Sequence, residues 1–181
     1  MVSALLEMGA DVNQACTDNG ATPLYAASMN GRLDVVEVLL EAGAYHDQYR
    51  TDAANPVDDG AGSSPLYIAS QNGYADVVRM LLESEADVNV AHNGHGETPL
   101  SVAVRFGHVD VIEALLEAGP EMDAACDDGR RTDAREVTPL YFASENGNAE
   151  VVGMLLGGGA DADVALSGHG ETPLARRRSS R

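Results

Sequence analysis

The sequence predicts an all-α repeat solenoid, in which short helix–turn–helix units stack side by side. A segment of 23 residues recurs four times, and each copy starts with Thr or Ser followed by Pro-Leu. Within each copy, apolar residues recur at helical spacing. Each copy holds helices too short to be stable alone in water, so neighbouring copies must bury one another's apolar faces.

The copies are arranged with alternating long and short connections. Their first residues are Thr22, Ser64, Thr98 and Thr138. A fifth Thr-Pro-Leu begins at Thr172, and the successive prolines are 42, 34, 40 and 34 residues apart. The segment Gly94–Leu100 returns unchanged at Gly168–Leu174. The array therefore looks like a duplicated two-repeat unit.

The first helix of each copy is expected to begin at the Thr or Ser and to run for about eight residues, ending at a glycine. The hydroxyl can accept a hydrogen bond from an unpaired N–H in the first turn. Proline at the first helical position has no N–H to leave unpaired. Glycine tolerates the left-handed conformation at the helix end. The expected ends are Asn30-Gly31, Asn72-Gly73, Phe106-Gly107 and Asn146-Gly147.

A second helix follows in each copy and opens with an acid, which is favourable near a helix N-terminus. These acids are Asp34, Asp76, Asp110 and Glu150. The pattern Val-Val-x-x-Leu-Leu then gives one apolar face, as in Val35, Val36, Leu39 and Leu40. A polar stretch leads to the next Thr-Pro-Leu.

These motifs resemble the ankyrin repeat family, whose pattern Thr-Pro-Leu-x-x-Ala-x-x-x-Gly precedes Val-Val-x-x-Leu-Leu-x-x-Gly-Ala-Asp-Val-Asn. The resemblance covers most of the chain apart from two long connections and the tail. It implies stacked ankyrin helix–turn–helix repeats in a curved array, with β-hairpin fingers at right angles to the helix pairs. It also implies a scaffold that binds another protein and has no enzymatic activity.

One departure from the family pattern concerns the residue after Thr-Pro-Leu. The family's usual His is replaced by Tyr25, Tyr67, Ser101 or Tyr141, so its hydrogen bonding with the Thr must be replaced.

We expect one array over residues 1–175 and a basic tail over residues 176–181. The array comprises a partial repeat at 1–13, repeats starting near 17, 59, 93 and 133, and a partial repeat at 167–175. Both ends fall inside repeats. An alternative is therefore an interaction fragment of a larger multidomain protein whose catalytic or membrane part is missing.

The charge is strongly acidic, with 29 Asp and Glu against 11 Arg and a net charge of -18. Nucleic acid is a poor partner, because its binding depends on cationic contacts. Such a surface would instead steer a basic protein towards it. No apolar run reaches the ~18 residues of a membrane span, and Met1–Ala10 shows no secretory signal. We expect a monomer without membrane insertion.

Cysteines and histidines give no sign of a metal, a cofactor or a catalytic centre. Cys16 and Cys126 lie three repeats apart, so stacking would place them ~25–30 Å apart, beyond disulfide reach. Reduced thiols indicate an intracellular location, either cytoplasmic or nuclear. His95 and His169 should be ~15–20 Å apart, too far for a shared metal. His92 and His95 could meet locally, but two imidazoles on a finger make a weak site.

The resemblance places partner contacts on the concave face, at the finger tips and the exposed part of the first helices. The finger candidates are Asp18, Asn19, His95, Glu97, Arg135, His169 and Glu171. The first-helix candidates are Met29, Asn30, Gln71, Asn72, Arg105, Phe106, Glu145 and Asn146.

Two long connections, 44–58 and 120–132, are expected to form extended fingers, the first carrying Tyr45 and Tyr49. Met29, Arg105 and Phe106 stand out, because apolar, aromatic and Arg side chains dominate interface energies. The alternative for Phe106 is that it packs into the neighbouring helix pair.

Overall fold

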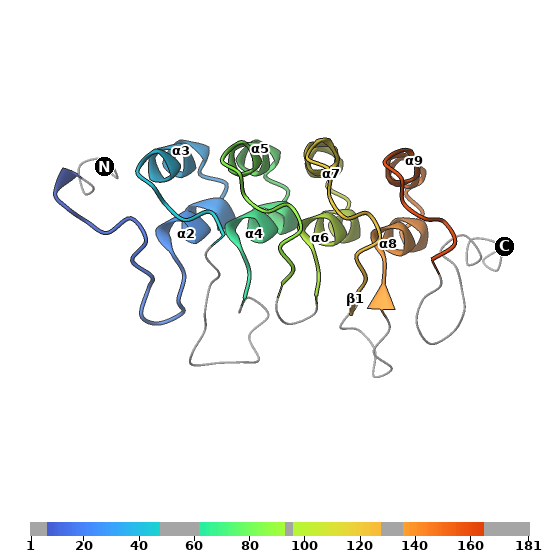
Figure 1. Cartoon of the computed structure of the whole chain (residues 1–181), viewed down its shortest axis with the longest axis horizontal. Helices are drawn as coiled ribbons and strands as arrows, with labels where there is room; N and C mark the ends of the chain where they lie inside the picture. Colours follow the sequence, from blue (N-terminus) through green and yellow to red (C-terminus); the bar gives the residue numbers. More distant parts are fainter. Residues whose placement is uncertain (1–6, 48–61, 93–95, 128–135, 165–181) are drawn as a thin grey trace.

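A computed structural model describes residues 7–47, 62–92, 96–127 and 136–164, and these residues form a row of four helix pairs (Figure 1). The first helices are α2 (Pro23–Met29), α4 (Pro65–Asn72), α6 (Pro99–Phe106) and α8 (Pro139–Glu145). The second helices are α3 (Leu33–Glu41), α5 (Ala75–Glu83), α7 (Val109–Glu117) and α9 (Ala149–Gly157). The expected all-α repeat solenoid is confirmed.

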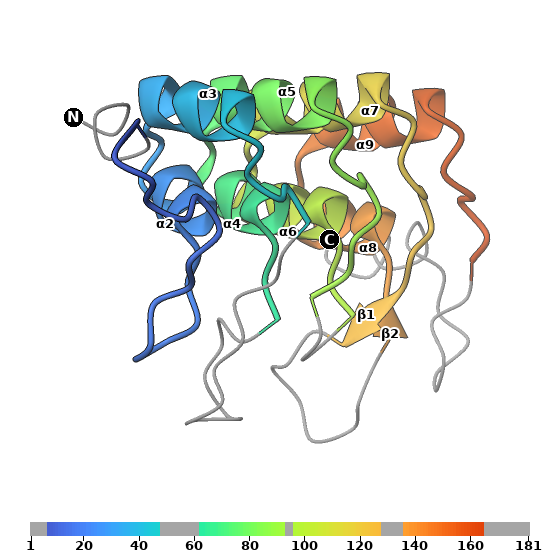
Figure 2. The same cartoon turned by 60° about the vertical axis from the view of Figure 1, so that its left-hand side comes forward.

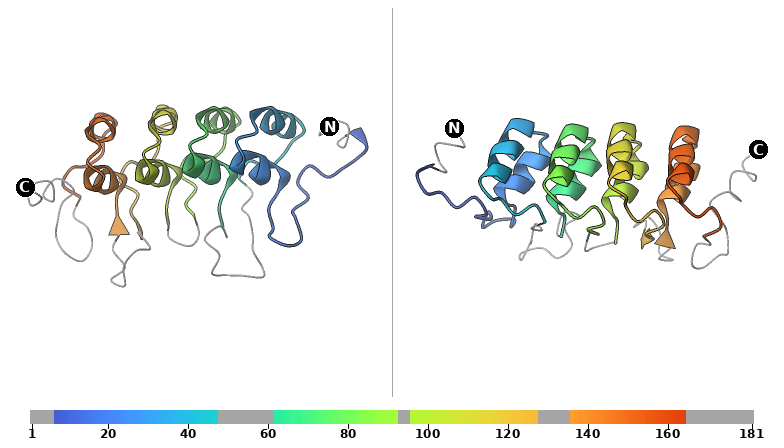
Figure 3. Two further views of the ribbon diagram at one scale, coloured as in Figure 1. Left: turned by 180° about the vertical axis from the view of Figure 1, so that it is seen from behind. Right: turned by 45° about the horizontal axis from the view of Figure 1, so that its top comes forward.

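The helices form two layers, one of first helices and one of second helices (Figure 2). Each first helix packs on the first helix of the next pair, and α3, α5, α7 and α9 do the same in the other layer. Every pair has the same orientation along the row, as views from other sides also show (Figure 3). The helix pairs therefore follow one another in space in the same order as along the chain.

The connections between pairs leave the helix layers on the side of the first helices (Figure 2). In one of them, β1 (Cys126–Asp127) pairs antiparallel with β2 (Glu136–Val137), with Cys126 opposite Val137. A β-hairpin finger, as the resemblance implies, is confirmed at this connection.

The hydroxyl caps of the first helices form as the sequence predicts. The Thr22 hydroxyl accepts the Tyr25 N–H at 3.1 Å, and the Ser64 hydroxyl accepts the Tyr67 N–H at 3.1 Å. The Thr98 hydroxyl accepts the Ser101 N–H at 3.2 Å, and the Thr138 hydroxyl accepts the Tyr141 N–H at 3.3 Å. In α6 the Ser101 hydroxyl also accepts the Thr98 N–H at 2.7 Å, which completes a capping box. A serine thus supplies a bond that the tyrosines at this position cannot.

The core consists of one apolar layer for each helix pair. Every pair contributes one Leu from its first helix and two aliphatic residues from its second, all at most 3% exposed. These layers are Leu24, Val36 and Leu39; Leu66, Val78 and Leu81; Leu100, Ile112 and Leu115; and Leu140, Val151 and Leu155. Since each layer is thin, its stability depends on the neighbouring pairs.

A ladder of side-chain to backbone bonds joins the turns that follow the second helices. In each rung, an Asn or Asp side chain accepts the backbone N–H of the corresponding turn one repeat later. The rungs are Asn13 to Tyr45 at 2.8 Å, Asp47 to Asp87 at 3.1 Å, Asn89 to Glu121 at 2.7 Å, and Asp123 to Asp161 at 3.1 Å. These acids and amides therefore belong to the framework.

Some expectations concern residues that the structure does not describe. The partial repeat at 167–175 and the basic tail at 176–181 lie outside the described residues, and the partial repeat at 1–13 is described only from residue 7. Within the described ranges, every helix is too short or too polar to cross a bilayer.

Candidate protein-binding faces

All the predicted contact residues except the buried Glu97 fall into three groups. Those outside the described residues are Tyr49, His95, Arg135, His169 and Glu171. Those with exposed side chains are Asp18, Met29, Asn30, Tyr45, Asn72, Phe106, Glu145 and Asn146. Those that are half-buried are Asn19, Gln71 and Arg105.

Among the exposed residues, the aromatic ones are the most notable. Tyr45 is 65% exposed and Phe106 is 52% exposed. The alternative in which Phe106 packs into a neighbouring helix pair is therefore wrong.

Glu97, expected at a finger tip, is only 3% exposed, so the expectation of an exposed contact there is also wrong. Its Oε2 accepts the Tyr67 hydroxyl at 2.7 Å and lies 2.9 Å from Nη2 of Arg105. The finger therefore turns this side chain inward, between α4 and α6. Val137, which precedes its helix cap as Glu97 does, is fully buried.

The polar cluster around Glu97 is held together by several kinds of contact. The ring of Tyr67 stacks on His92, with centroids 5.0 Å apart, and His92 is itself 3% exposed. Burial, and after it the charge of the Glu97 carboxylate, raises the pKa of the Tyr67 hydroxyl well above its ordinary value of 10.0. The hydroxyl therefore stays protonated at neutral pH and donates to Glu97.

The ends of the first helices are tied to the preceding repeat. The Asn72 side chain donates to the Met29 carbonyl at 3.3 Å, and the Asn146 side chain donates to the Arg105 carbonyl at 3.2 Å. Both asparagines were predicted as partner contacts, but they also hold the framework.

In α6, Phe106 stands where α4 and α8 have these asparagines, and His108 makes the corresponding bond. Its Nε2 lies 3.0 Å from the Gln71 carbonyl, so this nitrogen must carry the proton. The His108 ring also lies against Gly73, where a Cβ would come within 2.8 Å of the ring. Sequence reasoning missed His108. The available signal was its place directly after the glycine, where every repeat has a different residue.

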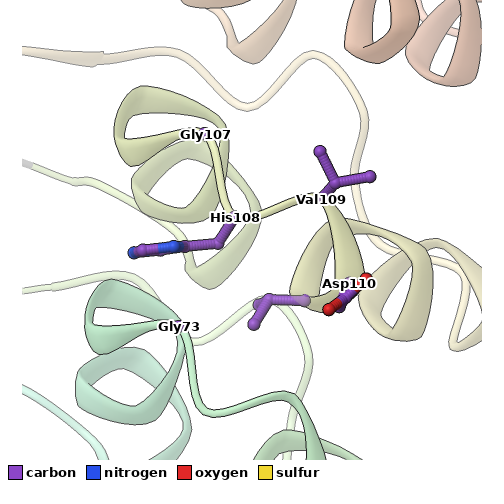
Figure 4. A pocket seen from close by; sticks show the side chains of 6 residues that line it. Gly73, Gly107, His108, Val109 and Asp110 are labelled. Atoms are coloured by element: carbon purple, nitrogen blue, oxygen red, sulfur yellow. The ribbon is translucent and has the colours of Figure 1, made fainter.

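Two open hollows lie along the turns between first and second helices. One, of about 300 Å³, is lined by Gly73, Gly107, His108, Val109, Asp110 and Val111 (Figure 4). The other, of about 330 Å³, shares Gly73 and Asp110 with it and adds Leu33, Tyr74 and Asp76 among its lining residues. The two hollows therefore adjoin.

The described residues include neither a cluster of metal ligands nor a disulfide. Across the described ranges, no group of three or more His, Cys, Asp or Glu side chains gathers as metal ligands would. Cys16 is an exposed thiol and Cys126 is a buried one, and neither is in a disulfide.

Comparison with known families gives matches along most of the chain. A family model described as ankyrin repeats (3 copies) matches residues 1–52 and 47–126. A second model, described as ankyrin repeats (many copies), matches residues 102–156. No curated protein matches the sequence significantly.

Proposed function

The chain belongs to the ankyrin repeat family, and from this premise we propose that it binds a partner protein across its fingers and first helices. Ankyrin repeats are generally protein–protein interaction modules and are typically not enzymes. The proposed surface is called here the finger-side face, and it comprises Asp18, Met29, Asn30, Tyr45, Asn72, Glu145 and Asn146.

One observation carries this proposal. At the same position of each first helix the chain places a different side chain, namely Met29, Gln71, Arg105 and Glu145. The hydroxyl caps, the buried leucines of the core layers and the ladder keep the same positions in every pair. A regular frame that presents one apolar, one amide, one basic and one acidic group is suited to recognise a specific protein surface.

Tyr45 supports the finger part of this face. Its backbone N–H is fixed by Asn13, while its ring stays 65% exposed beside an open hollow of about 380 Å³ lined by Ala44, His46 and Asp47. An exposed Tyr on a fixed backbone loses little conformational entropy when it is buried by a partner.

The charge of the surface favours a basic partner. Within the described residues the only Lys or Arg side chains are Arg32, Arg79 and Arg105, and Arg105 is paired with Glu97. Acidic side chains therefore dominate the exposed charge, and a basic protein would be attracted to it.

The test is an affinity capture that compares the intact protein with Met29→Ala and Tyr45→Ala. Both variants should reduce capture of the same partner by about tenfold, because each removes an exposed anchor. Leu156→Ala serves as the matched control, since Leu156 is 39% exposed on α9, away from this face. Raising the salt concentration should weaken capture.

Two results would count against the proposal. One is capture that is equal in all the variants while their helicity is unchanged. The other is capture that is lost in Leu156→Ala alone, which would move the contact to the layer of second helices.

A further inference from the structure

Phe106 is exposed at a position where the stack does not need it. In α4 and α8 the equivalent residues, Asn72 and Asn146, donate to the preceding repeat. Phe106 cannot donate, and His108 makes the bond to the Gln71 carbonyl instead. The framework is thus complete without Phe106, whose ring remains 52% exposed and available to a partner.

The exposed aromatic residues along these turns are held in fixed positions. The Arg105 guanidinium carbon lies 5.1 Å from the centroid of the Phe106 ring, and the His108 ring lies 6.2 Å away at 23°. One repeat earlier, Tyr74 packs against Gly31 so closely that a Cβ there would come within 2.6 Å of the ring. Tyr74 is nevertheless 37% exposed. Rings that are already fixed lose little entropy on binding.

Acidic side chains line the two hollows along these turns. Asp76 and Asp110 are exposed and both line the larger hollow, while Asp110 also lines the smaller one (Figure 4). Arg79 lies 3.6 Å from Asp76, but the two side chains are 44% and 79% exposed, so this pair is weak. A basic group from another protein could compete for this site.

We propose that this surface, called here the turn face and made of Leu33, Tyr74, Asp76, Phe106 and Asp110, binds an extended partner segment with basic and apolar side chains. Packed helices lie ~8–10 Å apart, and an extended chain in the polyproline II conformation advances ~3.1 Å per residue with about three residues per turn. Side chains three residues apart therefore share one face of the segment and would meet successive repeats. A basic side chain would lie between the two carboxylates, with apolar ones on the aromatic rings.

The fourth repeat provides an internal comparison for the turn face. It keeps the acid as Glu150, but Asn146 and Asn148 stand in place of Phe106 and His108. Asn146 donates to the Arg105 carbonyl, and Asn148 accepts the Val151 N–H at 3.2 Å to cap α9. The turn face therefore ends at the third repeat, and the fourth supplies an acid without the rings.

The test uses a short fluorescein-labelled peptide of alternating Arg and Leu, titrated against the full chain by fluorescence anisotropy. The double variant Asp76→Asn/Asp110→Asn is compared with Glu113→Gln/Glu150→Gln, which changes the net charge equally at exposed acids outside the turn face. The first double variant should bind about fivefold more weakly, and the second should bind within about twofold of the intact protein.

Two further comparisons test the apolar part of the turn face. Phe106→Ala should weaken binding about tenfold, because it removes the aromatic anchor, while Leu156→Ala should leave it unchanged. Replacing each Leu of the peptide by Ala should weaken binding by a similar factor.

Several results would overturn the inference. Equal weakening by the two double variants would mean that only the net charge matters. Full affinity in Phe106→Ala, or in the peptide without Leu, would remove the aromatic contact. Loss of peptide binding in Tyr45→Ala would place the peptide on the finger-side face, a result that contradicts the turn face and leaves the proposed function standing.

Discussion

The junction between α4 and α6 and the junction between α6 and α8 use the same backbone frame with different chemistry. At the α4–α6 junction, the residue before the helix cap is Glu97, whose carboxylate is bound by Tyr67 and Arg105. At the α6–α8 junction the equivalent residue is Val137, fully buried in the apolar core. The α4–α6 junction thus contains a buried ion pair at the position where the α6–α8 junction has an apolar side chain.

The ends of the first helices also carry different side chains at the two junctions. At the α4–α6 junction the His108 ring covers Gly73, whereas a Cβ placed on Gly107 would meet nothing within 4 Å. Asn146 then makes the bond to the Arg105 carbonyl at the α6–α8 junction. The frame therefore accepts either an aromatic or an amide, provided that one donor reaches the preceding carbonyl.

The comparison shows that repetition of the backbone does not make the repeats energetically equivalent. A buried ion pair is often no more stabilising than hydrocarbon of similar shape, but removing one partner alone is costly. The α4–α6 junction should therefore be the more sensitive of the two to single substitutions.

The largest effect is expected for Glu97→Ala. It leaves the Tyr67 hydroxyl and the Arg105 guanidinium without their shared acceptor, and it should lower the free energy of unfolding by about 2 kcal/mol. The loss should be smaller than for a fully buried pair, because the Arg105 side chain is 20% exposed and can reach water. Urea unfolding followed by circular dichroism measures the change.

The matched control replaces all three partners with apolar residues, as Tyr67→Phe/Glu97→Val/Arg105→Leu. This variant makes the α4–α6 junction apolar, with valine at the position that Val137 occupies in the α6–α8 junction. It should be more stable than Glu97→Ala, because none of the three partners keeps an unpaired polar group. If Glu97→Ala unfolded at the same urea concentration as the intact protein, the buried pair would not distinguish the two junctions.

The second-largest loss of stability is expected for Gly73→Ala, and Gly107→Ala is its matched control. Both glycines have positive φ, +80° and +76°, so each Ala should cost about 1 kcal/mol from backbone strain. Gly73→Ala also places a Cβ 2.8 Å from Nδ1 of His108 and should cost about 1 kcal/mol more. Equal losses in thermal unfolding would show that the His108 ring moves aside freely.

The sequence predicted those parts of the fold that are set within a repeat. The cap at Thr98 and the helix end at Gly73 follow from local backbone chemistry, so the motif alone placed them. The inward turn of Glu97 could not be predicted in this way, because the finger backbone, not helical periodicity, sets its direction. Aligning the copies would have helped, since the equivalent Ser63 and Val137 are small or apolar and buried.

The role of His108 depends on geometry between repeats. Its equivalents Arg32, Tyr74 and Asn148 share no chemistry, so the variation marks the position but does not reveal which bond His108 makes. Its partners, the Gln71 carbonyl and Gly73, belong to the preceding pair and become neighbours only after stacking. The hollows of the turn face could not be predicted for the same reason, since residues of neighbouring repeats line them.

The third effect is the pH dependence of the α4–α6 junction. The folded protein holds the Tyr67 proton through burial and the nearby Glu97 carboxylate, with Arg105 opposing, whereas the unfolded chain releases it near its ordinary pKa of 10.0. Since the folded pKa is raised, stability present below pH 10 is lost as the pH rises above it.

Tyr67→Phe isolates this contribution. It should cost about 1 kcal/mol at neutral pH through the lost hydrogen bond, and it should make stability fall less steeply between about pH 9 and 11. Urea midpoints measured across this range check both statements. An identical alkaline decline in the intact protein and the variant would exclude Tyr67 as its source.

The smallest effect, and the only gain, is expected where the second repeat ends. Glu85 has φ +67°, while Gly43, Gly119 and Gly159 occupy the same position after the other second helices with φ of +84°, +73° and +100°. Glu85→Gly should therefore raise the free energy of unfolding by about 0.5–1 kcal/mol, because it relieves left-handed strain at a helix end. Glu85→Gln is the control, since it removes the unfavourable charge at the helix C-terminus but keeps the side chain. If Glu85→Gln raised the free energy of unfolding as much as Glu85→Gly, the charge of Glu85, rather than backbone strain, would be the source of the gain.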